Sequence, residues 1–125
     1  MSENTFRESM DIHRPALRKR YADAFRSSGI GALLFPTTPL VAPPLTTGDE
    51  ITIAGRAVSF INIAKNAFPS SCAALPGISV PMGLSSLGLP MGLEMDGKSG
   101  DDDKLLSLAA RVSAIIGAIP PPPRM

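Results

Sequence analysis

Residues 75–117 read LPGISVPMGLSSLGLPMGLEMDGKSGDDDKLLSLAARVSAIIG, and this stretch decides the fold. Two short apolar runs, Leu75–Val80 and Met91–Met95, predict two strands, and the Gly/Ser-rich residues Met82–Pro90 predict the turn between them. An amphipathic helix is predicted next, because acidic residues stand where the helix dipole favours negative charge and apolar residues then recur at helical spacing. The acidic residues are Asp101, Asp102 and Asp103, and the apolar ones are Leu105, Leu108, Ala109, Val112 and Ile116. Gly117 and the proline run Pro120–Pro123 end the helix.

The residues before this stretch predict one more strand and little else that would complete a sheet. A helix is expected over residues 1–29, because Pro15 suits the first turn of a helix and Gly29 suits a C-terminal end. The remaining expected elements are a buried strand Gly31–Phe35, a proline-rich extended loop, a hairpin of Ile51–Ile53 with Arg56–Val58, and a short helix over residues 60–67. Three short strands with few helices do not make a self-sufficient α/β sheet. We therefore expect residues 1–125 to form a single partial domain.

Composition excludes several classes of protein. The chain has 125 residues, enough for one ordinary domain or a piece of a larger one, and 44% are hydrophobic, unlike a disordered protein. A net charge of +1 gives no electrostatic footprint for nucleic acid, and no apolar run reaches the roughly 18 residues that a membrane span requires. With one cysteine, no intrachain disulfide can form, and the polar N-terminus shows no signal peptide. These features predict a cytoplasmic protein that binds neither nucleic acid nor membrane.

No catalytic arrangement follows from the residues alone. Ser70, Ser71 and Cys72 form the most nucleophilic cluster, but a nucleophile needs a base, and nothing in the sequence places the single histidine, His13, beside it. Close backbone packing explains these small residues better. The Gly-Leu-Ser-Ser-Leu-Gly run of residues 83–88 is not a nucleophile elbow, and no lysine follows a serine by three residues. The prediction is that the chain carries no catalytic residues.

Metal and anion sites are not predicted either. Glu94, Asp96 and the aspartates 101–103 offer hard oxygen ligands, but their spacing does not match a calcium loop, and helix-end electrostatics accounts for the aspartates. The basic residues near the first helix predict a solvated face. These are Arg14, Arg18, Lys19 and Arg20. No metal and no cofactor is expected.

One ordered motif covers the middle of the chain. An asparagine is followed by a proline three residues on, then by small polar residues and a Leu-Pro-Gly-Ile-Ser-Val-Pro-x-Gly run. The matching residues are Asn66, Pro69, Ser70, Ser71, Ala73, Leu75, Pro76, Gly77, Ile78, Ser79, Val80, Pro81 and Gly83. A second block, Gly-Leu-Pro-x-Gly-Leu-Glu-x-Asp-Gly, occupies residues 88–97 and precedes the final helix. In order and spacing, the chain from about Arg14 to about Ile116 resembles the C-terminal part of the amidase signature family, in its indole-acetamide and mandelamide hydrolase branch.

The resemblance implies a fold and a partial site. The fold is α/β: a fragment of the amidase-signature mixed β-sheet flanked by helices, with the amphipathic helix at its C-terminal end. Family members hydrolyse amides with a Ser–cis-Ser–Lys triad in a Gly/Ser-rich region that lies N-terminal to every motif matched here, so the chain is expected to be inactive alone. The region from Asn66 to Leu75 corresponds to a wall of the acyl pocket. Ser71, Cys72 and Leu75 are its expected substrate-binding residues, with space for an aryl group. Ala74 departs from the family pattern, which has glycine there.

Three hypotheses about function remain. In the first, the chain is the C-terminal portion of an amidase that closes the sheet and forms a wall of the pocket. It is then either a truncated gene product or the partner of a separately encoded N-terminal half. In the second, it is a small non-enzymatic interaction module, because the strand edges beside Leu33 and Ile78 are templates for pairing, with a second copy in a homo-oligomer among others. The third, independent catalysis at Cys72, lacks a base.

Overall fold

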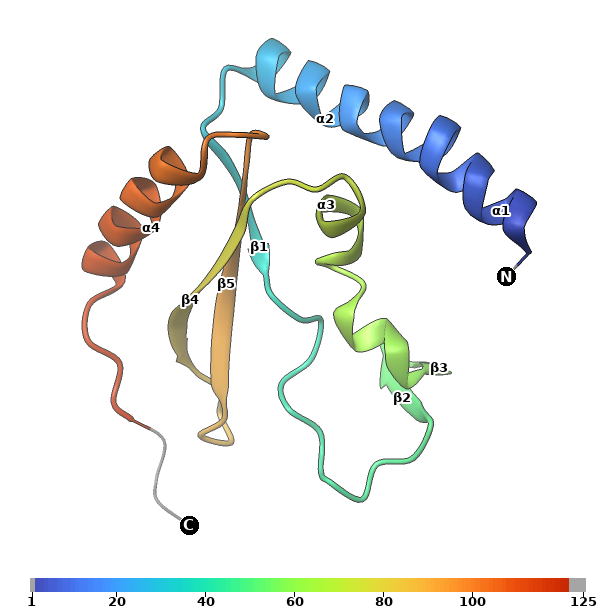
Figure 1. Cartoon of the computed structure of the whole chain (residues 1–125). Coiled ribbons are helices and arrows are strands. Elements are labelled where there is room, and N and C mark those ends of the chain that lie inside the picture. Colours follow the sequence, from blue (N-terminus) through green and yellow to red (C-terminus); the bar gives the residue numbers. More distant parts are fainter. Residues whose placement is uncertain (1, 122–125) are drawn as a thin grey trace.

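A computed structural model of the protein describes residues 2–121 and shows a small antiparallel sheet with helices on both faces (Figure 1). Its elements in chain order are α1 (Glu3–Glu8), the π-helical turn η1 (Ser9–His13), α2 (Arg14–Ser28), β1 (Ala32–Pro36), β2 (Glu50–Ile53), β3 (Arg56–Ser59), the 3-10 turn η2 (Phe60–Ala64), α3 (Phe68–Cys72), β4 (Gly77–Leu84), β5 (Pro90–Gly97) and α4 (Asp102–Ile116). Pro122 and Pro123 of the predicted proline run lie outside the described residues.

Strand β5 is the centre of the sheet. The order is β1-β5-β4, and both pairs are antiparallel, so that Met95 lies between Leu34 of β1 and Ile78 of β4. Strands β2 and β3 form a separate hairpin. The α/β fold and the three sheet strands expected from the sequence are therefore confirmed.

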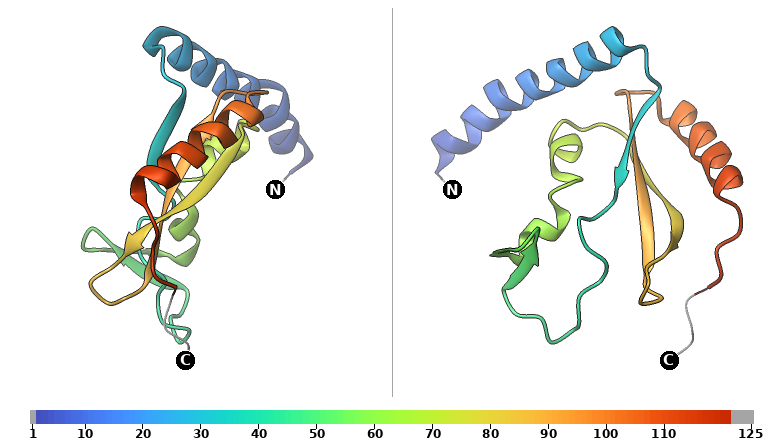
Figure 2. Two further views of the ribbon diagram at one scale, coloured as in Figure 1. Left: turned by 90° about the vertical axis from the view of Figure 1, so that its left-hand side faces the viewer. Right: turned by 180° about the vertical axis from the view of Figure 1, so that it is seen from behind.

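One face of this sheet is covered by α4, as two views of the chain show (Figure 2). Met95, which has no exposed surface, packs there with Val80, Leu105 and Ala109 in the main hydrophobic core. A Cβ atom at Gly97 would lie 3.3 Å from the Cβ of Leu105, so glycine at this position lets the first turn of α4 approach the strand closely. The predicted amphipathic helix thus provides half of the core.

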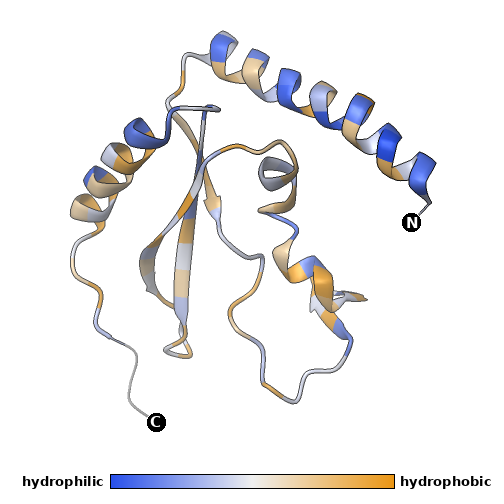
Figure 3. Cartoon of the chain, in the orientation of Figure 1, coloured by the Kyte–Doolittle hydropathy of each residue, from blue (hydrophilic) through white to orange (hydrophobic). Residues whose placement is uncertain are grey.

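The N-terminal helix lies on the other side of the sheet and extends beyond it (Figures 1 and 2). Hydrophilic and apolar positions alternate along it (Figure 3), and only Phe25 of α2 is buried. Gly29 ends α2 in the left-handed conformation, with φ of 64°, as the sequence predicted. No helix within residues 2–121 is long and apolar enough to cross a bilayer.

Two details of the predicted secondary structure were wrong. The turn expected over Met82–Pro90 is shorter, because β4 continues to Leu84 and β5 begins at Pro90. A β-bulge between Pro81 and Gly83 allows this continuation, since a bulge tolerates a proline that donates no ladder hydrogen bond. The short helix expected over residues 60–67 is instead the 3-10 turn η2 followed by α3, which has Pro69 in its first turn.

The sheet face opposite α4 carries two carboxyl groups beside the apolar Leu33 and Phe35 of β1. Glu94 and Asp96 alternate with the core residues of β5 and point to this side, and Asp96 is only 2% exposed. A Cβ atom at Gly77, opposite Asp96 on β4, would lie 3.0 Å from Oδ1 of Asp96 and 3.1 Å from Oε1 of Glu94, so both carboxyl groups lie over this glycine. Burial raises the pKa of each carboxyl group, and the hydroxyl groups of Ser70 beside Asp96 and of Thr37 beside Glu94 partly oppose the rise.

Replacing Met95 by alanine is expected to lower the free energy of unfolding by about 2–5 kcal/mol, because it leaves a cavity between β5 and α4. Met82→Ala is the matched control, since Met82 is 38% exposed and its loss should cost less than about 0.5 kcal/mol. Urea unfolding followed by circular dichroism measures both values. Equal losses in the two variants would contradict this account of the core.

The buried carboxyl group of Asp96 should make stability depend on pH. Because its pKa is raised in the folded state, the folded chain holds more protons than the unfolded chain above pH ~4, and stability should fall as pH rises through the folded-state pKa. Asp96→Asn should remove this loss of stability while keeping an acceptor for Ser70. Asp11→Asn, at an exposed position of η1, is the control. Thermal unfolding between pH 4 and 8 measures the slope, and an unchanged slope in Asp96→Asn would refute the assignment.

Candidate substrate pocket

A hollow of about 380 Å³ lies between the N-terminal helix and α3. Its lining residues come from η1, the first turns of α2, and the C-terminal end of α3. They are Ser9, Met10, His13, Arg14, Leu17, Ser71 and Cys72. Of the three predicted substrate-binding residues, the structure brings Ser71 and Cys72 into this pocket, whereas the half-buried Leu75 lies beyond α3 and is not part of the lining.

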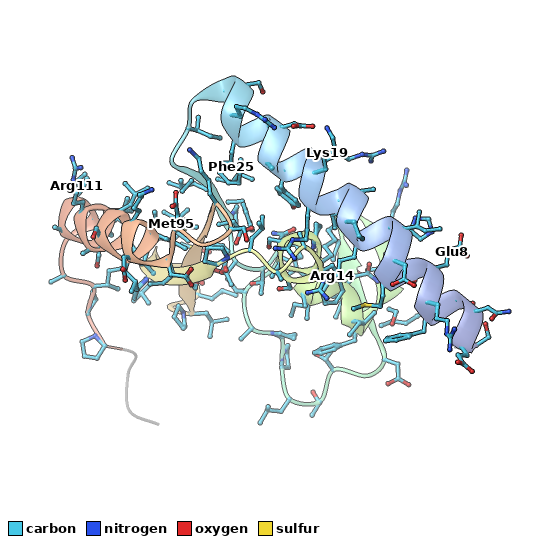
Figure 4. The ribbon with its side chains drawn as sticks, turned by 45° about the horizontal axis from the view of Figure 1, so that its top comes forward. Glu8, Arg14, Lys19, Phe25, Met95 and Arg111 are labelled. Atoms are coloured by element: carbon cyan, nitrogen blue, oxygen red, sulfur yellow. The ribbon has the colours of Figure 1, made fainter. Side chains whose placement is uncertain are left out.

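One long-range hydrogen bond joins the two walls. Nε of Arg14 donates to the backbone oxygen of Cys72 at 3.0 Å. Figure 4 labels Arg14 on the N-terminal helix. This oxygen stands at the C-terminal end of α3, where helix carbonyls lack partners within their own helix, so the guanidinium group stabilises the helix end. Arg14 is thereby fixed at the pocket wall.

Other residues of the family-like motif support α3 rather than line the pocket. Ser70 is buried and faces Asp96. Nδ2 of Asn66 donates to the backbone oxygen of Pro36 at 2.8 Å and thus ties the segment before α3 to the end of β1. Ser70 and Ala73 of this motif are therefore buried in the fold, whereas Ser71 and Cys72 line the pocket.

The pocket contains residues that the sequence did not assign to a site. His13 and Arg14 are distant from Cys72 along the chain. His13 ends the π-helical turn η1, which has no sequence signal, and Arg14 begins α2 directly after it. His13 makes a contact of 3.4 Å between its Nε2 and Oε1 of Glu8. Among the described residues, His13 forms no hydrogen bond with the side chain of Ser71 or Cys72, so the pocket shows no assembled pair of nucleophile and base.

The acidic residues considered as metal ligands are dispersed. Glu94 and Asp96 lie on the sheet face, while Asp101 accepts a hydrogen bond from Lys104 at 2.8 Å, and Asp102 and Asp103 occupy the first turn of α4. Within residues 2–121, no group of three or more histidine, cysteine, aspartate or glutamate side chains could hold a metal ion.

Comparisons with known proteins identify the family. The model of the family described as "Amidase" matches residues 1–106. Indoleacetamide hydrolase from Agrobacterium vitis is 39% identical over 82% of the chain, and mandelamide hydrolase from Pseudomonas putida is 36% identical over 98% of it. A solved structure described as "Crystal structure of amidase" superimposes on 94% of the chain with a TM-score of 0.83 and 31% identity.

These relatives are much longer than the part that matches. The chain covers 22% of the Agrobacterium vitis enzyme, 23% of the Pseudomonas putida enzyme and 26% of the solved amidase chain. The fold is therefore a fragment of the amidase fold. Since the family model spans most of the sequence and the backbone superimposes over nearly all of it, the chain belongs to the amidase family.

Proposed function

We propose that the chain acts as the C-terminal portion of a cytoplasmic amide hydrolase for arylacetamides. The carrying observation is a match that spans nearly all of this chain and only about a quarter of each relative. In this role the chain closes the sheet and supplies one wall of the acyl pocket, through Ser71, Cys72 and the packing of Leu75. A serine in the remaining portion attacks the amide carbonyl and releases ammonia as the acyl-enzyme forms. Water then hydrolyses the acyl-enzyme to the acid and restores the serine hydroxyl.

The sheet geometry supports a role in closing a larger sheet. Thr37 donates its N–H to the carbonyl of Gly92 at 2.9 Å, which continues the register of the β1–β5 pair. Hydrogen bonds in an antiparallel pair recur at every second residue, so the N–H and C=O groups of Ala32 and Leu34 point away from β5. Leu34 is also 51% exposed. Edge strands of this kind pair readily with a further strand.

The pocket supports the absence of activity in the chain alone. Ser71 and Cys72 face the solvent-accessible hollow without a hydrogen-bonded base, and transition-state stabilisation needs oriented donors as well as a nucleophile. Chemistry therefore belongs to the remaining portion, which we propose is a separately encoded half or the preceding part of a longer chain.

The second candidate is an interaction module that assembles with its own copies. The N–H and C=O groups of β1 that point away from β5 favour this candidate, because the β1 edges of two copies can pair with each other. Sedimentation of the isolated chain separates the candidates: a stable homodimer whose assembly is lost in Leu34→Pro would favour the module.

A chimera tests the proposed function. The C-terminal quarter of the Agrobacterium vitis indoleacetamide hydrolase is replaced by this chain, and ammonia released from indole-3-acetamide is measured. We expect hydrolysis by the chimera, and none above buffer by the truncated enzyme or by this chain alone, whether wild type or Cys72→Ala.

The control is a chimera carrying Leu105→Asp, which places a charge in the core between α4 and β5. This change should abolish the ammonia release that the chimera gains over the truncated enzyme. A soluble but inactive chimera, or ammonia release by this chain alone, would contradict the proposal.

A further inference from the structure

We propose that the pocket between the N-terminal helix and α3 binds an aromatic carboxylate, the acid formed when an arylacetamide is hydrolysed. This rests on the proposed function, which supplies the reaction, and it adds a ligand and a recognising residue. The ligand's ring would lie against the apolar wall, and its carboxylate would bind Arg14.

The size and lining of the pocket suit one aromatic group. A hollow of about 380 Å³ falls within the range of small-molecule sites. Met10 and Leu17 line it from the N-terminal helix, and Cys72 lines it from α3. Methionine and cysteine sulfur atoms are polarisable and pack favourably against aromatic rings. These three side chains therefore provide an apolar wall for the ring.

Arg14 is the feature that points to an anion. Its Nε is committed to the backbone oxygen of Cys72, which holds the planar guanidinium group at the wall, while its terminal nitrogens form no ion pair or hydrogen bond within residues 2–121. Lys19 and Arg26, on the same helix, are both engaged by Asp23. A half-buried guanidinium group with unused parallel donors matches the two oxygens of a carboxylate.

The other polar groups of the pocket are compatible with this assignment. Oε1 of Glu8, the acidic group nearest to His13, contacts that ring at 3.4 Å, and no carboxylate of the described residues lies within 4.0 Å of Arg14. The hydroxyl of Ser9 donates to the backbone oxygen of Thr5 at 2.8 Å, whereas Ser71 offers a second donor to the ligand. An amide would use the same donors, but a carboxylate gains charge-assisted bonds that are roughly twice as strong.

Alkylation of Cys72 reports occupancy of the pocket, because it is the only cysteine in the sequence. The rate of modification by iodoacetamide is measured by mass spectrometry on the full chain, with increasing phenylacetate or phenylacetamide. We expect phenylacetate to slow alkylation saturably and to protect at a concentration about 10-fold lower than phenylacetamide does. The rate in 8 M urea, where the pocket is absent, gives the reference for an unprotected thiol.

Arg14→Gln should raise the protecting concentration of phenylacetate by about 10-fold and leave that of phenylacetamide nearly unchanged. Arg14→Lys should lie between, since it keeps the charge and loses the paired donors. Arg20→Gln, an exposed position of α2 outside the pocket, is the matched control. In a variant that unfolds, Cys72 reacts without ligand as fast as it does in 8 M urea. The ligand assignment is then tested by the protection of the wild-type chain by phenylacetate compared with phenylacetamide.

Equal protection by acid and amide, or no protection by phenylacetate, would overturn the ligand assignment. The result is independent of the chimera, which measures ammonia and not Cys72. An active chimera without protection of Cys72 refutes the carboxylate pocket alone, whereas protection with an inactive chimera refutes the proposed function alone.

Discussion

Strand β5 packs between its two neighbours and under α4, and this packing organises the whole fold. This strand is the only one hydrogen-bonded on both sides in the three-stranded sheet of the described residues. Its alternation gives the sheet two unlike faces: Met95 points into the apolar core with α4, and Asp96 points to the other side. A one-residue change of register would bury carboxyl groups in the core and expose its apolar residues, so both faces fix the same pairing.

Burying the carboxyl group of Asp96 costs free energy of folding, and the apolar core on the other face of the sheet offsets this cost. Asp96 is almost fully buried, and the raised pKa means that its charged form is disfavoured in the fold. The hydroxyl group of Ser70, in α3, lies beside this carboxyl group and favours its charged form. Ser70 and Ala73, at the end of α3, are both buried, so this side of the helix faces the interior of the fold.

Much of this arrangement was predictable because it is local. The helix over residues 102–116 followed from three aspartates and an apolar stripe, and the strands followed from short apolar runs between prolines and glycines. The bulge at Pro81 was not predictable in this way, since a proline within an apolar run usually ends a strand. The pairing of Arg14 with Cys72 was also beyond prediction, because it joins residues 58 positions apart through a helix whose phase depends on a π-helical turn. The family-like motif pointed to Ser71 and Cys72, yet the opposite wall carries no motif at all.

The pocket is therefore a consequence of how α3 is held. On its inner side Ser70 is buried beside Asp96 of β5, and on its outer side the carbonyl of Cys72 accepts a hydrogen bond from Arg14. These two attachments lie within three consecutive residues of one short helix, which has too few turns to be stable by itself. A helix of this length therefore takes its position from its contacts with the rest of the fold. The residues that give the chain its core and those that shape its pocket are thus linked through one strand, in an order that runs from Met95 to Asp96, to Ser70, and finally to Cys72.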